Sequence, residues 1–274
     1  MTSPARRWLI PLHLTTAVAS TVAAQPPTVG PATGEITFLP VSALPYDPTQ
    51  PAVIGARAAD PKDYPASFYT AQHEGRCTST VVGPRVLLTA AHCVGDGGTA
   101  TLLSANQRYV ATCTHAPDYA WEPSADYALC LLDRVLPGIP YERVSIERAR
   151  LRPGLQLLLT GFGCTRPDGT GGNDGVYRVG ESPVYRLPSG SNNHIVTAGG
   201  AALCFGDSGG PAFRFLDPFK RSRTQVSVNS RGNIRDSSWL SSLSTGPAVA
   251  FLREWSLRHG ARICGVHADV QGCR

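Results

Sequence analysis

Three features that would indicate other kinds of protein are missing from this 274-residue sequence. Beyond an N-terminal stretch, no apolar run approaches the about 20 residues that a membrane-spanning helix needs. There is no Cys-x-x-Cys pair, so the usual zinc-ligand spacing is absent. There is also no internal repeat, which argues against solenoids and propellers. These absences leave a globular protein without an expected metal ion.

Charged residues are scarce as well, at 16% of the chain, with a net charge of +5. The nearest approach to a basic run is Lys-Arg-Ser-Arg at residues 220–223, and so short a run is typical of a solvated loop. We therefore expect no nucleic-acid partner. The chain contains 28 glycines and 23 prolines, which interrupt helices and argue against a helical bundle.

Cysteine, in contrast, is plentiful. The eight cysteines, without metal-site spacing, favour disulfide bonds and therefore an oxidising compartment. Eight cysteines allow about 105 connectivities, so their pairing stays open at this point. They are Cys77, Cys93, Cys113, Cys130, Cys164, Cys204, Cys264 and Cys273.

The N-terminus indicates export. Arg6 and Arg7 precede an apolar stretch over 8–23, and small residues ending at Ala24 offer a cleavage site. We interpret residues 1–24 as a signal peptide, with a retained anchor as the alternative, and expect a secreted or periplasmic protein that leaves the membrane once the signal is removed. The proline-rich segment 25–52 has no periodicity, so we expect it to be extended and poorly packed.

From residue 53 onward, short β-type runs are separated by turn residues, a spacing that indicates an all-β sandwich or barrel. One helix is expected over Pro247–His259, followed by Gly260. The chain is expected to cross between two lobes, about 53–150 and 151–274, near Ile146–Pro153. The predicted strands are Ser67–Thr70, Thr78–Val82, Val86–Thr89, Tyr109–Thr112, Tyr127–Leu132, Leu155–Thr160, Asn193–Val196, Ala212–Phe215 and Thr224–Val228.

The most informative stretch is Cys-Phe-Gly-Asp-Ser-Gly-Gly-Pro at residues 204–211. A serine hydroxyl such as that of Ser208 needs a neighbouring base and donors for the oxyanion it creates. The stretch also satisfies G-x-S-x-G, the nucleophile elbow of α/β-hydrolases. That fold needs a helix directly after the serine, whereas Pro211 and a β-type run follow here, so this alternative is disfavoured.

Two earlier residues could complete a catalytic set with this serine. His92 follows an apolar strand among small residues, which leave its imidazole accessible, and the adjacent Cys93 can tether the turn. Asp126 leads directly into another apolar strand, where an unpartnered carboxylate would pay a large desolvation penalty. A histidine N–H is a natural partner for such an acid.

These blocks, in the order His92, Asp126, Ser208, resemble those of trypsin/chymotrypsin-like serine proteases, and the sequence is similar to short secreted bacterial members. Val-Ile-Gly-Ala at 53–56 resembles the mature N-terminus of the family, and the resemblance covers residues 53–274. It implies two six-stranded antiparallel β-barrels with a C-terminal helix. It also implies a monomeric serine endopeptidase without metal or cofactor, whose partners are protein or peptide substrates and protein protease inhibitors.

The resemblance also implies residue roles. Ser208 would be the nucleophile and His92 the general base that Asp126 orients. The N–H groups of Gly206 and Ser208 would form the oxyanion hole. Asp207 would pair with the α-ammonium of Val53 after cleavage behind Ala52, so that residues 25–52 would be a propeptide.

Disulfides and specificity follow from the same resemblance. It implies Cys77–Cys93 and Cys113–Cys130, and leaves Cys164–Cys204 and Cys264–Cys273 as the remaining pairs. Ala202 would form the floor of the primary pocket, with residues 230–232 (Ser230, Arg231 and Gly232) as one wall. No carboxylate is expected there, so a small or apolar side chain before the scissile bond is favoured, and Arg231 could favour an acidic residue nearby. The alternative function is a catalytically silent homologue that serves as a secreted binding module.

Overall fold

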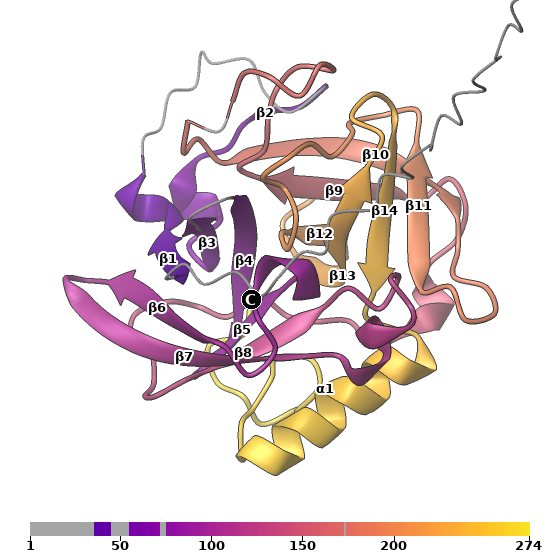
Figure 1. Cartoon of the computed structure of the whole chain (residues 1–274). Coiled ribbons are helices and arrows are strands. Elements are labelled where there is room, and N and C mark those ends of the chain that lie inside the picture. The colour runs from indigo at the N-terminus through magenta and orange to yellow at the C-terminus, as the bar shows by residue number, and fades with distance from the viewer. Residues whose placement is uncertain (1–35, 45–54, 72–74, 173) are drawn as a thin grey trace, which may run out of the picture. The chain divides into compact units, whose positions relative to one another are not determined.

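The computed structural model describes residues 36–44, 55–71, 75–172 and 174–274, which form two β-barrels and a C-terminal helix (Figure 1). This arrangement confirms the all-β, two-barrel prediction. The expected signal peptide (1–24), most of the 25–52 segment and Val53 lie outside the described residues.

The first barrel is closed by seven strands in the order β1-β3-β4-β5-β8-β7-β6. Six strands were expected, and the additional one is β1, which pairs antiparallel with β3 and parallel with β6. The strands are β1 (Ile36–Pro40), β3 (Ser67–Ala71), β4 (Arg76–Gly83), β5 (Val86–Thr89), β6 (Thr99–Ser104), β7 (Gln107–His115) and β8 (Ala128–Leu132).

The second barrel has six strands in its ring, because β10 pairs both with β9 and with β11. The two-residue strand β2 (Arg57–Ala58) adds to the outside of β10, although it precedes the first barrel's strand β3 in the sequence. The ring strands are β9 (Gln156–Gly161), β10 (Arg178–Arg186), β11 (His194–Ala198), β12 (Pro211–Phe215), β13 (Arg223–Gly232) and β14 (Ser237–Ser242).

Strand β1 corrects one expectation. We expected segment 25–52 to be poorly packed, but within it Ile36 and Phe38 are buried in the core of the first barrel. Alternate residues of β1 are buried, as in a strand with one face toward a core. The sequence did not reveal this strand, because a run of five residues gives only a weak periodic signal. The many prolines of the segment also favoured an extended, unpaired chain. Residues 36–40 are therefore an integral part of the barrel.

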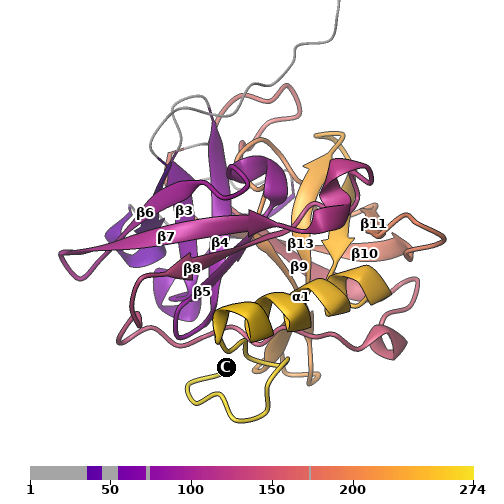
Figure 2. The same cartoon turned by 60° about the horizontal axis from the view of Figure 1, so that its bottom comes forward.

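The helix α1 (Gly246–His259) ends at Gly260, whose φ of 56° gives the left-handed cap that glycine favours. Phe251, Leu252 and Trp255 belong to the same core cluster as the first barrel. Helix α1 (yellow) runs along the bottom of the molecule in Figure 1 and lies in front in Figure 2. Leu257 was expected near the apolar face of this helix but is 86% exposed. Within the described residues, no helix has the length and apolar character to cross a bilayer.

All eight cysteines form disulfide bonds, and the pairs coincide with the expected ones. The bond between Cys77 and Cys93 joins β4 to the short 3-10 helix η3 (Ala91–Cys93) that carries His92. A bond that closes a loop of about 15 residues stabilises the fold by about 3 kcal/mol in the chain-entropy model. The other pairs are Cys113–Cys130, Cys164–Cys204 and Cys264–Cys273.

We predict that Phe38→Ala lowers the free energy of unfolding by about 3–4 kcal/mol, because it opens a cavity in the first barrel. The measurement is urea unfolding with the disulfide bonds intact. Thr37→Ala, on the opposite face of β1, is the matched control and should cost less than about 1 kcal/mol. Equal, small effects of both changes would show that β1 does not contribute to the barrel.

Candidate active site

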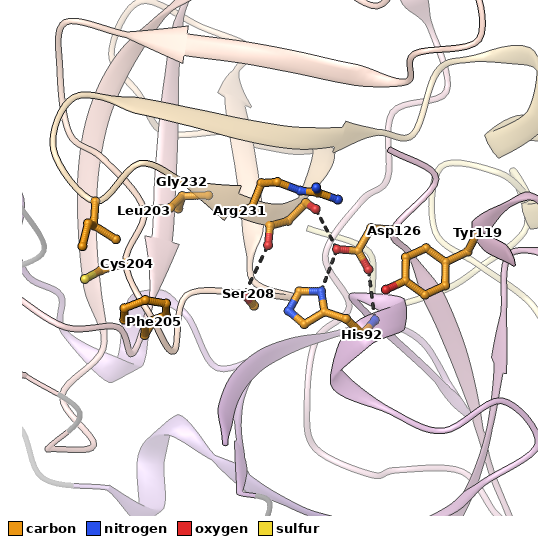
Figure 3. Close-up of a pocket in the computed structure, with 11 residues that line it drawn as sticks. His92, Tyr119, Asp126, Leu203, Cys204, Phe205, Ser208, Arg231 and Gly232 are labelled. Atoms are coloured by element: carbon orange, nitrogen blue, oxygen red, sulfur yellow. Dashed lines mark hydrogen bonds and ion pairs between the residues drawn. The ribbon is translucent and has the colours of Figure 1, made fainter. Parts of the chain in front are cut away.

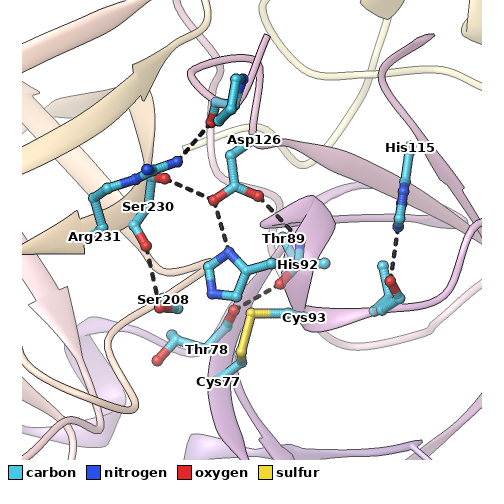
Figure 4. Close-up of polar contacts among 12 residues, drawn as sticks. Cys77, Thr78, Thr89, His92, Cys93, His115, Asp126, Ser208, Ser230 and Arg231 are labelled. Carbon is cyan, nitrogen blue, oxygen red and sulfur yellow. Dashed lines mark hydrogen bonds and ion pairs between the residues drawn. A yellow bond between two sulfur atoms is a disulfide. The ribbon is translucent and has the colours of Figure 1, made fainter. Parts of the chain in front are cut away.

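Three loops bring His92, Asp126 and Ser208 together between the barrels. His92 lies on η3 directly after β5, and Asp126 lies just before β8, so both come from the first barrel. Ser208 lies in the loop between β11 and β12 of the second barrel. The imidazole of His92 lies between the carboxylate of Asp126 and the hydroxyl of Ser208 (Figures 3 and 4).

Asp126 is the most constrained member of this set. Its side chain is 2% exposed, and its Oδ2 lies 2.7 Å from Nδ1 of His92. The backbone N–H of His92 donates to Oδ1 at 3.0 Å, and the hydroxyl of Ser230 donates to Oδ2 at 2.7 Å. Burial raises the pKa of Asp126, but the interactions with His92 and Ser230 outweigh burial and leave the pKa below its ordinary value. Asp126 is therefore an anion that holds the imidazole in one orientation.

The hydroxyl of Ser208 donates to the backbone carbonyl of Ser230 at 3.3 Å. Rotation about the Cα–Cβ bond of Ser208 would turn this hydroxyl toward His92. Catalytic hydrogen bonds are often long or misaligned without substrate and tighten when it binds. Ser230 thus contacts Ser208 through its carbonyl and Asp126 through its hydroxyl.

The glycine after the serine marks a close approach of the two barrels. Gly209 has a φ of 81°, and a Cβ at this position would lie 2.2 Å from the carbonyl oxygen of Thr78 and from the hydroxyl oxygen of Thr89. The amide of Gly209 donates to the carbonyl of Asn229 at 2.7 Å. Both the conformation and the space therefore require glycine here. This contact fixes the position of the loop that carries Ser208 relative to the first barrel, and therefore relative to His92.

Asp207 points away from the cavity into the protein. Its Oδ1 accepts the N–H of Gly163 at 2.8 Å, and its Oδ2 accepts the N–H of Cys204 at 2.9 Å. Burial raises the pKa of Asp207 to about 6, although both hydrogen bonds act in the opposite direction. A buried carboxylate with this pKa would gain from a cationic partner. The expected partner, the α-ammonium of Val53, lies outside the described residues.

A cavity of about 390 Å³ opens beside Ser208. Ala202, expected as its floor, is fully buried and is not among the lining residues. A Cβ added to Gly232 would lie 2.7 Å from the carbonyl oxygen of Leu203, so the backbones of these two lining residues approach each other closely. The cavity is lined by His92, Tyr119, Asp126, Leu203, Cys204, Phe205, Ser208, Ser230, Arg231, Gly232 and Ile234.

The charges around the cavity are unequal. The carboxylate of Asp126 is the single acidic group among the lining residues, and it is engaged by His92. Arg231 contributes a guanidinium, whose Nη2 donates to the carbonyl of Pro123 at 2.9 Å. The remaining wall is largely apolar and includes the exposed ring of Phe205. The cavity therefore suits an apolar side chain, with a positive charge at one edge.

No metal centre is indicated at this site. Ligand atoms of Cys77, His92 and Cys93 lie close together, but the two sulfur atoms are joined in a disulfide bond. A disulfide sulfur is not the thiolate that binds metal ions. His92 is then the single remaining donor of this group.

Comparisons with known proteins agree with the geometry. The family model for trypsin matches residues 53–235. The chain belongs to the trypsin family. A trypsin from Simulium vittatum is 28% identical over 162 residues, which cover 49% of this chain and 64% of that protein. A solved structure of a mutant of human heparin binding protein (CAP37) superposes with a TM-score of 0.59 at 17% identity. It covers 75% of this chain and 97% of that one.

Sequence reasoning missed two contacts of this trypsin-family site. Ser230 was expected as a wall of the substrate pocket, and its hydroxyl on Asp126 was not anticipated. Tyr119, on the 3-10 helix η4 (Pro117–Ala120), also lines the cavity. A serine or a tyrosine far from the motif in sequence carries no signal of its own, because only the fold brings it to the site.

We predict that His194 makes the protein less stable in acid. Burial, together with the charge of Arg231, lowers the pKa of His194 from 6.5 to about 4, although Asp126 and Glu122 act in the opposite direction. The unfolded chain therefore binds a proton near pH 6.5 that the folded chain resists. Above about pH 6.5 this histidine should not affect the free energy of unfolding. As the pH falls from 6.5 toward 4, the free energy of unfolding should decrease, by about 1–2 kcal/mol at pH 5.

The measurement is the free energy of unfolding in urea at pH 7 and pH 5. His194→Gln, which cannot titrate in this range, should lose less stability between these two pH values than the wild type. The same loss in both proteins would contradict the prediction.

Proposed function

We propose that the protein is a secreted serine endopeptidase that acts through a Ser208–His92–Asp126 triad. The observation that carries this proposal is the buried Asp126 carboxylate bonded to Nδ1 of His92, with the ring facing Ser208. This bond assigns the proton of the neutral ring to Nδ1 and leaves Nε2 free to accept one. The arrangement is therefore that of a base ready to activate a serine hydroxyl.

The reaction proceeds in two halves. Oγ of Ser208 attacks the scissile carbonyl carbon while Nε2 of His92 takes the hydroxyl proton, and Asp126 stabilises the imidazolium. The C–N bond then breaks, the leaving amine receives that proton, and an acyl-enzyme remains. Water attacks the acyl group with His92 again as base, which releases the acid and restores Ser208. The N–H groups of Gly206 and Ser208 hold the oxyanion, each worth about 2.7–4 kcal/mol in comparable sites.

Activation by cleavage after Ala52 is part of the proposal, with Val53 pairing with Asp207. The support is the position of Gly55, two residues after Val53. A Cβ added to Gly55 would lie 3.6 Å from the Cα of Ala201, which belongs to the same β11–β12 loop as Asp207. Because β1 is built into the first barrel, the released segment would stay bound as a separate strand. The active form would then consist of two chains held together without a disulfide bond.

A fluorophosphonate probe tests the proposed activity. We expect it to label the mature protein at Ser208, and expect Ser208→Ala to remain unlabelled. Asp126→Asn should label and hydrolyse peptides about 10⁴-fold more slowly, because the wrong tautomer of His92 is favoured. N-terminal sequencing of the labelled chain, separated under denaturing conditions, should give Val53. A folded, mature wild-type protein that does not label would refute the endopeptidase proposal.

The lining of the cavity supports a preference for a small or apolar residue before the scissile bond. Leu203, Phe205 and Ile234 supply an apolar wall. A Lys or Arg side chain would find no free carboxylate among the lining residues. The guanidinium of Arg231 at the cavity edge supports an acidic residue nearby in the substrate.

We predict that a peptide-library profile shows this acidic preference and that Arg231→Glu reverses it. An exposed ion pair contributes about 0.2–1 kcal/mol, so the expected change in relative kcat/KM is about 1.4- to 5-fold. Arg258→Glu, on the exposed side of α1, makes the same change in net charge at a distance and should leave the profile unchanged. Equal effects of both variants would attribute the preference to overall charge rather than to Arg231.

A second candidate is a silent homologue that acts as a binding module, as the name of the heparin binding protein allows. All three triad side chains are present at this site, and a silent homologue does not require them. Monomeric state and recognition by protein inhibitors belong to the main proposal. Inhibition by a substrate-like protein inhibitor would support the protease, since such inhibitors bind a formed active site.

A further inference from the structure

The proposed oxyanion hole consists of the N–H groups of Gly206 and Ser208, and the Gly206–Asp207 peptide links the two peptide groups that carry these donors. This residue has a φ of 107°, a conformation that is accessible because glycine lacks a Cβ. The same freedom allows either neighbouring peptide to rotate. If the hole is to be preorganised, the peptide that carries the N–H of Gly206 and the Gly206–Asp207 peptide that leads to Ser208 must both be held.

The peptide before Gly206 is held from the second barrel. The carbonyl of Phe205 accepts the N–H of Cys164 at 3.0 Å. A trans peptide places its N–H opposite its C=O, so the N–H of Gly206 is directed away from Cys164. The Cys164–Cys204 disulfide ties the same two loops together.

The peptide after Gly206 is held from the first barrel. The hydroxyl of Thr78, on β4, donates to the carbonyl of Gly206 at 2.9 Å, and both groups are buried. The same hydroxyl accepts the N–H of Phe162 at 3.3 Å. Its orientation is thereby defined by one donor and one acceptor.

The backbone of Thr78 adds two further bonds to the catalytic loops. Its N–H donates to the carbonyl of Ser208 at 2.7 Å. Its carbonyl accepts the hydroxyl of Thr89, three residues before His92, at 2.9 Å. Thr78 thus contacts the loop of the nucleophile and the strand that leads to the base (Figure 4).

We infer that Thr78, through its hydroxyl, is a positioning residue for the oxyanion hole. It acts through Gly206, whose carbonyl it holds, and does not itself touch the substrate. The inference rests on the proposed function and adds a residue to it. Without the hydroxyl, the carbonyl of Gly206 and the N–H of Phe162 would be buried without these partners. The Gly206–Asp207 peptide would lose one of its two hydrogen bonds, the other being that from the N–H of Asp207 to the carbonyl of Cys204 at 3.1 Å.

Each variant that tests this inference differs from the wild type by one heavy atom of one side chain. Thr78→Val removes the hydroxyl at nearly constant shape, and Thr78→Ser keeps it. The matched control is Thr80→Val on the same strand, because Thr80 is equally buried and its hydroxyl has no hydrogen-bond partner within the described structure.

We expect Thr78→Val to lower kcat by about 10- to 100-fold with KM within about 2-fold, since the lost contact matters for the oxyanion and not for ground-state binding. Affinity for a peptide boronic acid, whose tetrahedral adduct occupies the hole, should fall in parallel. Thr78→Ser should restore kcat to within about 3-fold, and Thr80→Val should behave as wild type. A kcat of Thr78→Val within 2-fold of Thr80→Val, or equal losses in kcat and in substrate affinity, would overturn the inference.

One readout does not require activity. Hydrogen–deuterium exchange across residues 205–208 should be faster in Thr78→Val than in Thr80→Val, because the peptide after Gly206 has lost its anchor. If wild-type protein shows no activity but this difference is present, the proposed function fails and the positioning role stands. If wild type is active and neither exchange nor kcat responds to Thr78→Val, the positioning role fails alone.

Discussion

The burial of one carboxylate governs the arrangement of this protein. Asp126 lies between the barrels with almost no contact with water, where an unpaired charge would be costly. It is stabilised because His92 from the first barrel and Ser230 from the second both donate to it. Satisfying this charge therefore requires the two barrels to meet in one relative position. The same position brings Ser208 beside the imidazole and places Gly209 against β4.

The first barrel extends upstream of the segment that resembles the mature N-terminus of trypsins. Strand β1 supplies Phe38 to the core and separates β3 from β6. A propeptide that only blocks a site can diffuse away, whereas a strand of a closed barrel can leave only if the ladder on both sides breaks. Proposed activation at Val53 would therefore change a covalent connection without removing the strand. It would free an α-ammonium for Asp207 while the first barrel stays closed.

Much of the fold and site was predictable from particular residues. Each of the nine expected strands overlaps an observed one, because alternating or β-branched runs bounded by glycine and proline identify strands locally. The strands that were missed, among them β6 and β10, contain small or polar residues that give weak periodicity. Of the pocket residues, Ser230, Arg231 and Gly232 do line the cavity. Ala202 is fully buried and does not line it, because counting along the chain does not reveal which side chains the fold leaves open to the cavity.

The sequence by itself determined the chemical groups and their order: a serine among glycines, an earlier histidine beside a cysteine, and an acid entering an apolar strand. These signals are local, since each depends on neighbouring residues that shape one loop. Only the tertiary structure decided which distant groups satisfy the buried polar atoms. The hydroxyls of Ser230 and Thr78 and the strand β1 gain their roles through hydrogen bonds and packing across the barrels. A hydroxyl or a short strand has no preferred partner until the chain has folded around it.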